Sequence, residues 1–172
     1  KIFLLTNQLL KEDFKEFIID KVKPEAIILG DLHKAFDWER LNKVFRLIYN
    51  SDAMIIALHK NKYCKRENKI SLDLGPFVAA LEYATSKKSI LIGKPEKNFF
   101  DLAIQDMGLK KEDVLMIGDD IFSDIGGAIK NFIPTIQVRT GKFQKKDETN
   151  SYPQPDYRIN SIVDLPNILK IA

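Results

Sequence analysis

The residues best suited to chemistry lie at the end of an apolar run, where one predicted strand stops in a group of acids. Val114 to Ile117 are four consecutive apolar residues, a pattern typical of a short strand buried on both faces, and Gly118 ends it. Three carboxylates follow at once, those of Asp119, Asp120 and Asp124. In a parallel sheet, ligands bind at the carboxyl ends of the strands. Because three acids at one strand end repel one another, the pattern favours a hard divalent cation between them, namely Mg2+.

A candidate cation of the protein itself, Lys94, follows the preceding predicted strand. That strand, Ser89 to Ile92, stops at Gly93-Lys94-Pro95, because proline cannot continue a strand ladder. The ammonium group is therefore expected at the carboxyl end of its strand, where a compact charge suits the neutralisation of a transferred phosphoryl group. The alternative interpretation is that Lys94 is one surface lysine among many.

The elements that must position these residues alternate along the chain, which predicts an α/β fold with a mainly parallel sheet. Strands are expected at Ile2–Leu5, Ala26–Leu29, Ala53–Leu58, Ser89–Ile92, Val114–Ile117, Pro134–Val138 and Tyr157–Ile159. Helices are expected at residues 10–18, 38–49, 76–84, 96–107, 125–132 and 165–169. Residues 59–75 read as a long polar connection, and residues 142–155 read as a surface loop.

Composition excludes several classes of protein. The 172 residues are 45% hydrophobic and 30% charged, as in an ordinary soluble α/β protein. The net charge of +3 is too small to indicate a nucleic-acid partner. No apolar run approaches the roughly 20 residues that span a bilayer, so we expect no membrane partner and a cytoplasmic protein. The single cysteine, Cys64, excludes an internal disulfide and fits a reducing compartment.

Three sequence blocks together resemble the haloacid dehalogenase-like (HAD) hydrolase superfamily, in its subfamily with a large α/β cap (type IIA, C2 cap). The blocks are Gly-Pro-Phe-Val-x-Ala-Leu-Glu-Tyr-Ala-Thr at 75–85, Gly-Lys-Pro-Glu-Lys-x-Phe-Phe at 93–100 and Met-Ile-Gly-Asp-Asp at 116–120. The resemblance covers nearly the whole chain. It implies a cap domain over residues 1–88 and the C-terminal half of a Rossmann-like core over residues 89–172.

The resemblance also implies roles for the candidate residues. Asp119 corresponds to a direct Mg2+ ligand, whereas Asp124 holds a metal-bound water or Lys94. Asp120 is a further metal contact, or else only an acid at the start of a helix. Lys94 neutralises the phosphoryl group and the aspartyl-phosphate intermediate.

The polar connection falls in the cap, where family members place residues that face the substrate. His59, Lys60 and Tyr63, with Lys65 nearby, are therefore candidate contacts to a small phosphorylated substrate. A charged loop facing only solvent is the alternative interpretation. The resemblance further implies a homodimer formed through the cap.

One expected feature is missing from the sequence. The family's first motif, Asp-x-Asp-Gly-Thr, which supplies the nucleophilic aspartate, occurs nowhere in the 172 residues. Two hypotheses follow. The chain is part of a Mg2+-dependent phosphatase of small phosphorylated metabolites and is inactive alone, or it is a non-catalytic pseudo-enzyme or interaction module.

Overall fold

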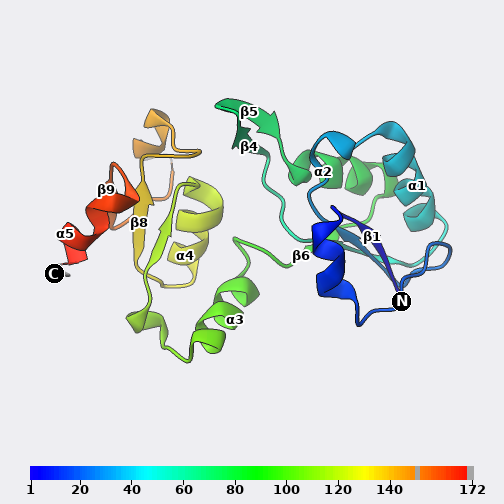
Figure 1. Ribbon diagram of the computed structural model, residues 1–172, viewed down its shortest axis with the longest axis horizontal. Helices are drawn as coiled ribbons and strands as arrows, with labels where there is room; N and C mark the ends of the chain where they lie inside the picture. The colour runs from blue at the N-terminus through cyan, green and yellow to red at the C-terminus, as the bar shows by residue number, and fades with distance from the viewer. Residues whose placement is uncertain (150–151, 170–172) are drawn as a thin grey trace. The chain divides into compact units, whose positions relative to one another are not determined.

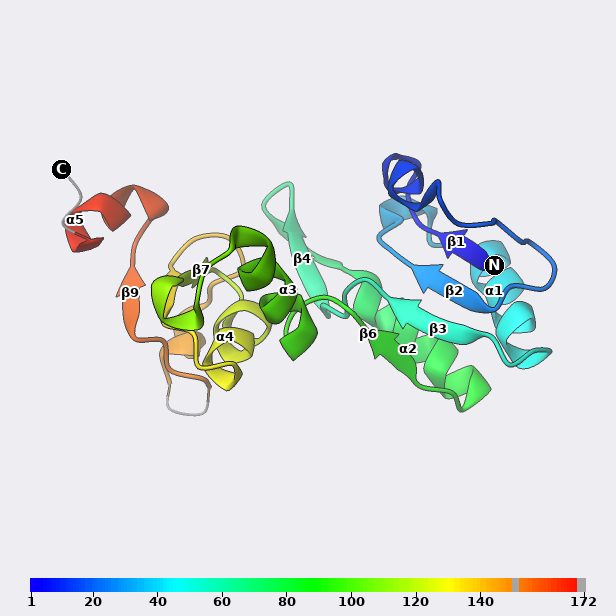
Figure 2. The same cartoon turned by 90° about the horizontal axis from the view of Figure 1, so that it is seen from below.

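The computed structural model describes residues 1–149 and 152–169. It divides into two compact units, Lys1–Gly93 and Lys94–Ala172, which are taken separately below. Figures 1 and 2 show the elements of each unit. Both units combine parallel strands with helices, so the predicted α/β fold class is confirmed.

The first unit is built on a four-stranded parallel sheet with the order β1-β2-β3-β6. Its strands are β1 (Ile2–Leu5), β2 (Ala26–Leu29), β3 (Met54–Ala57) and β6 (Ser89–Leu91). Register is in step across the sheet, with Ile2 opposite Ala26 and Ala26 opposite Met54. All four residues of β2 are buried, because this strand lies inside the sheet and both its faces carry apolar side chains.

Helices α1 (Trp38–Tyr49) and α2 (Leu74–Thr85) cover one face of this sheet. Asp37 caps α1, because its carboxylate accepts the backbone N–H of Arg40 at 2.8 Å. The helical spacing predicted an inward stripe on α1, and Val44 and Ile48 are indeed fully buried against Ile27, Leu29 and Ile55 of the strands.

Two expectations for the first unit are wrong. The helix predicted at residues 10–18 is only a 3-10 helix, η1 (Leu9–Phe14), and Phe17 and Ile18 beyond it are 53% and 67% exposed. The polar connection contains a hairpin of β4 (Tyr63–Arg66) and β5 (Lys69–Leu72). Its two-residue turn, Glu67-Asn68, has both φ angles positive, as a tight hairpin requires. The sequence indicates this turn only weakly, because of the two residues only Asn favours a positive φ.

The second unit contains a three-stranded parallel sheet with the order β7-β8-β9. The strands are β7 (Met116–Gly118), β8 (Thr135–Val138) and β9 (Tyr157–Ile159), and all four residues of β8, the central strand, are buried. Helix α3 (Lys97–Met107) ends at Gly108, which adopts the left-handed conformation. Helix α5 (Leu165–Leu169) follows β9.

The segment after the acid group differs from the predicted helix at 125–132. A π-helical turn, Ile121–Gly126, comes first, and only Gly127–Lys130 forms the α-helix α4. Ile125 and Ala128 are buried as expected, but Phe132 is 89% exposed with a φ of 59°. The wider π turn shifts the later residues out of the expected stripe, and such turns often occur at functional sites.

The boundary between the two units along the chain lies just after β6. The residues of this strand pair with β3 of the first sheet, for example Ile56 with Ile90, and the boundary of the compact units falls between Gly93 and Lys94. The resemblance had implied that residues 89–93 belong with the second part. The assignment of these units as cap and core stays a prediction. None of the helices in the described part of the chain is long and apolar enough to cross a membrane.

Candidate active site

The second unit brings Lys94 and Asp124 into direct contact. Lys94 Nζ lies 2.8 Å from Asp124 Oδ1, and the side chains are 37% and 8% exposed respectively. The Asp124 carboxylate also accepts the backbone N–H of Asp120 on Oδ2, at 3.2 Å. A carboxylate this well buried is stable only when paired, so it holds the lysine ammonium in a defined place at the unit's surface.

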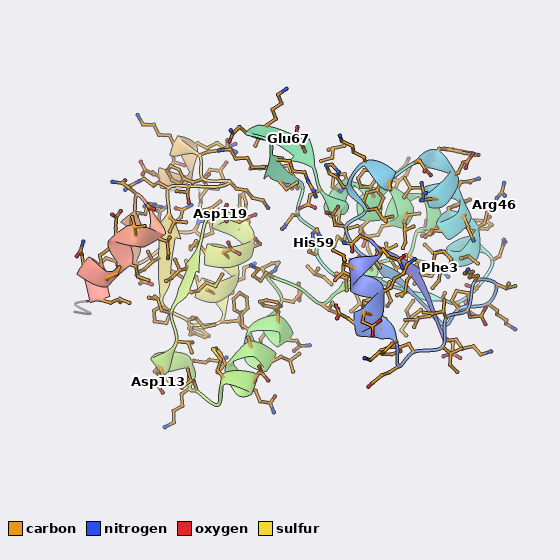
Figure 3. The ribbon with its side chains drawn as sticks, in the orientation of Figure 1. Phe3, Arg46, His59, Glu67, Asp113 and Asp119 are labelled. Carbon is orange, nitrogen blue, oxygen red and sulfur yellow. The ribbon has the colours of Figure 1, made fainter. Side chains whose placement is uncertain are left out.

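Gly118 makes room for that carboxylate. A Cβ atom on residue 118 would lie 2.3 Å from Asp124 Oδ2, closer than side-chain atoms approach one another. The glycine that ends β7 therefore allows the acid from the next turn to pack against the strand end. We call Asp119, Asp120, Asp124 and Lys94 together the acid corner; Figure 3 labels Asp119 within it.

Asp120 caps the start of the π-helical turn, so its side chain does not simply face solvent. Its Oδ1 accepts the backbone N–H groups of Phe122 and Ser123, both at 3.0 Å. Its Oδ2 lies 3.0 Å from Lys142 Nζ, and both side chains of this ion pair are less than one-fifth exposed. Burial raises the pKa of Asp120, but the N–H of Ser123 and the Lys142 ammonium outweigh it, so the pKa is lowered overall.

The turn Thr140-Gly141-Lys142 fixes the Asp119 carboxylate through a backbone hydrogen bond. The backbone N–H of Lys142 donates to Asp119 Oδ2 at 2.6 Å. Gly141 has a φ of 58°, and a Cβ there would lie 1.9 Å from that same oxygen. Only glycine fits this position, because any side chain would collide with the carboxylate and would also disfavour the backbone conformation.

The acid corner fits one half of a Mg2+ site. Its donors are carboxylate oxygens, which suit a hard cation. Asp119 uses Oδ2 for Lys142, which leaves Oδ1 without a hydrogen bond among the described residues. Both oxygens of Asp124 are engaged, and no set of three potential ligand side chains gathers anywhere in residues 1–149 and 152–169. Asp119 is therefore the residue that could hold the ion. The metal roles predicted for Asp120 and Asp124 remain predictions, because both carboxylates already have other partners.

The predicted substrate contacts belong to the first unit. His59 Nε2 lies 3.9 Å from Asp73 Oδ1, while His59 Nδ1 is buried without a partner (Figure 3). Lys60 Nζ contacts both carboxylate oxygens of Glu82 at 3.0 Å. Tyr63 lies half-buried at the start of β4. These contacts give Lys60 a structural partner within its own unit, and the substrate roles of all three residues stay predictions.

The partners of Glu82 predict an acid-sensitive contribution to stability. Burial raises the pKa of Glu82, but hydrogen bonds from Ser89 N–H and Oγ–H and the charge of Lys60 lower it to about 2. A lowered pKa stabilises the fold above the ordinary carboxyl pKa, and this contribution is lost as pH falls from about 4.5 towards 2. Glu82→Gln should cost roughly 2 kcal/mol in the free energy of unfolding at pH 7, with the difference shrinking towards pH 2.

Urea unfolding followed by the fluorescence of Trp38, the only tryptophan of the chain and a residue of the first unit, measures this difference. Glu12→Gln is the control, since Glu12 is 78% exposed in its pair with Lys15. A difference that stays constant with pH would show that the Glu82 charge contributes nothing.

The sequence interpretation missed the roles of Gly141, which it took as the end of a strand, and of Lys142, which it placed in a surface loop. A usable signal was present: Thr140-Gly141-Lys142 follows β8 after one intervening residue, as Gly93-Lys94 follows β6. Carboxyl ends of neighbouring parallel strands meet at one edge, so a cation after β8 is expected near the acids after β7.

Comparisons with known proteins identify relatives of this chain. The model of the HAD-hydrolase-like family matches residues 91–165. Phospholysine phosphohistidine inorganic pyrophosphate phosphatase of Xenopus laevis is 37% identical over 167 residues, covering 96% of this chain and 61% of that protein. Human haloacid dehalogenase-like hydrolase domain-containing protein 2 is 41% identical over 152 residues, covering 88% and 58%. The chain therefore resembles the haloacid dehalogenase-like hydrolase superfamily over nearly its whole length.

Solved structures of HAD-fold phosphatases show the same architecture. The 4-nitrophenylphosphatase of Thermotoga maritima superposes with a TM-score of 0.85 at 30% identity, covering 97% of this chain and 64% of that one. The chain thus spans about three fifths of the length of these HAD relatives. The resemblance predicted from the sequence is confirmed, and the residues that the family model matches include two of the three sequence blocks, those at 93–100 and 116–120.

Proposed function

We propose that the acid corner is the electrostatic half of a Mg2+-dependent phosphatase centre acting on small phosphorylated metabolites. The observation that carries this proposal is the contact of 2.8 Å between Lys94 and the buried Asp124, in the same unit as the half-engaged carboxylate of Asp119. Two of the three proteins compared above are phosphatases by name, which supports phosphoryl hydrolysis as the reaction class.

Each residue of the corner has a distinct task in this proposal. Lys94, 37% exposed, presents its ammonium to the phosphoryl oxygens, and Asp124 keeps that ammonium in position. Lys142 holds Asp120 by its side chain and Asp119 by its backbone, so the two neighbouring carboxylates cannot turn freely. Fixed charges of this kind stabilise a transition state without rearranging during the reaction.

Asp119 would hold the metal through its remaining oxygen. A bound Mg2+ would supply positive charge to the phosphoryl oxygens, as it does in other phosphoryl-transfer sites. The proposed substrate is a small molecule with a single phosphoryl group, because the corner offers only one lysine and one metal ligand to bind it. Contacts from His59, Lys60 and Tyr63 to the rest of such a substrate belong to the same proposal.

The nucleophile is the missing component. Asp119 is assigned to the metal and Asp124 to Lys94, and the Asp-x-Asp-Gly-Thr motif does not occur in the 172 residues. We therefore expect the 172-residue chain to be inactive alone. The same absence favours the second candidate function, a non-catalytic interaction module.

A comparison of two proteins tests both candidates. The 172-residue chain and the product of the complete gene are assayed for phosphate release from a panel of phosphoesters, with Mg2+ and with EDTA. The phosphatase proposal predicts Mg2+-dependent turnover by the complete gene product only. Absence of turnover on every ester supports the non-catalytic module. Turnover by the 172-residue chain would contradict the proposal that this chain contains no nucleophile.

A further inference from the structure

The outer side of β1 carries an open backbone edge. Towards β2 the strand is fully paired, with Gly30 N–H donating to Leu5 C=O at 2.9 Å. On its other side only Ile2 is paired, by bonds of 2.9 Å with Ile18 and Asp20. Since alternate residues of a strand face the same side, the N–H and C=O groups of Leu4 also face outward, and no partner for them occurs in the described residues.

A groove runs along this open edge. It consists of two adjoining hollows of about 300 and 240 Å³, which share Phe3, Leu4, Lys11 and Lys43 in their walls. Figure 3 labels Phe3 on this strand. Phe14 and Phe17 add apolar surface to the larger hollow, and Phe17 is 53% exposed. We call these two hollows the β1 groove.

All charged side chains that line the β1 groove are positive. These five cations are Lys11, Lys15, Lys21, Arg40 and Lys43. None of the acids in the described residues lines the groove. Arg40 and Lys15 are paired with Asp37 and Glu12 outside the lining. The other three have no carboxylate partner in the described residues, and Lys43 Nζ lies 5.4 Å from the centre of the Phe3 ring.

Lysines near a sheet edge often serve only to prevent aggregation. In that role they stand on the edge strand itself and project across its open bonds. Here β1 has the sequence Ile-Phe-Leu-Leu, and the cations project from η1, from α1 and from the segment around residue 21. They therefore border an open edge rather than block it, which is the arrangement that strand addition requires.

We infer that the β1 groove binds an extended acidic peptide segment of a partner protein, which adds to the sheet as a strand beside β1. The backbone groups of Leu4 would bond the peptide, and Lys11 and Lys43 would contact its carboxylates. The β1 groove is lined by the four consecutive residues from Phe3 to Thr6, which span roughly 13 Å at about 3.3 Å per residue, so a segment of about four residues fills it. This inference is independent of the phosphatase proposal.

Fluorescence anisotropy with a labelled hexapeptide, Glu-Glu-Val-Glu-Glu-Val, tests the inference on the 172-residue chain. Saturable binding is expected. The double variant Lys11→Glu/Lys43→Glu should weaken it at least about tenfold, since two favourable charge contacts become repulsive. The matched control is Lys69→Glu/Lys88→Glu, which makes the same change in net charge at exposed lysines of the same unit outside the groove. Circular dichroism verifies that both variants are folded.

Two further measurements separate the alternatives. A peptide N-methylated at alternate amides should bind at least about tenfold more weakly, because it cannot donate to the open edge. Equal binding of that peptide overturns strand addition in favour of a general anion site, as does equal weakening by the control variant. No saturable binding also overturns the inference. Sedimentation that shows self-association, lost in Lys11→Glu/Lys43→Glu, would assign the edge to a second copy of this chain instead.

Discussion

Replacing Lys94 by methionine is expected to lower both the stability of the second unit and any turnover at the acid corner. It leaves the Asp124 carboxylate, only 8% exposed, without its cation. We expect a loss of about 1–3 kcal/mol in the free energy of unfolding of the 172-residue chain, measured in urea at pH 7. If the complete gene product is a phosphatase, its kcat should fall by roughly 10²–10³, as when a charge-stabilising donor is removed from a reaction centre.

The double variant Lys94→Met/Asp124→Asn separates the two effects. It removes the unpaired charge and should recover most of the stability while turnover stays low. Lys97→Met is the control for a lost lysine, because Lys97 is 66% exposed and pairs with Asp101 on the surface of α3. If Lys94→Met is as stable as the Lys97→Met control, the contact with Asp124 does not hold the corner together.

Replacing Gly141 by alanine should disrupt the acid corner at the Asp119 carboxylate. The new Cβ would lie 1.9 Å from Asp119 Oδ2, so the carboxylate or the turn must move and the hydrogen bond from Lys142 N–H must lengthen. We expect a cost of about 2–3 kcal/mol in unfolding free energy, from the left-handed conformation together with the weakened charge-assisted bond. Faster hydrogen exchange at the Lys142 amide would report the lost bond directly.

Gly108→Ala is a matched control for this change. Gly108 also has a positive φ, 66°, but a Cβ there would meet nothing within 4 Å. It should therefore cost only the conformational part, about 1 kcal/mol. Equal losses in the two variants, with unchanged exchange at Lys142, would contradict the role of the 140–142 turn in holding Asp119.

The strand β2 was predictable because its apolar run is short, bounded by breakers and buried on both faces. The run Ala26–Leu29 matched its strand residue for residue, and α1 followed from its apolar stripe. Local patterns failed where geometry depends on the surroundings. Phe132 fits a helical stripe, yet the π-helical turn ahead of it displaces it into solvent. The hairpin at 63–72 was hidden because its strands are polar and half-exposed.

The site was predictable to the extent that its residues follow strand ends. Lys94, Asp119 and Asp124 were each found from a strand that stops, and the structure pairs the first with the last. Lys142, which is 22 residues from Asp120 in sequence, was missed although it also follows a strand end, that of β8. What the sequence does not show is how closely the turn approaches the acids, and the position of Gly141 against the Asp119 carboxylate establishes this.

Titration of the 172-residue chain with Mg2+, followed by the amide signals of a labelled sample, tests the central claim most directly. The account predicts weak binding, with a dissociation constant on the order of millimolar, because the chain offers one free carboxylate oxygen and few other ligands. Shifts should centre on Asp119 and Lys142 and disappear in Asp119→Asn, but persist in the exposed control Asp113→Asn. Shifts that are absent at saturating Mg2+, or that survive Asp119→Asn, would contradict the assignment of the acid corner as a metal-assisted phosphoryl site.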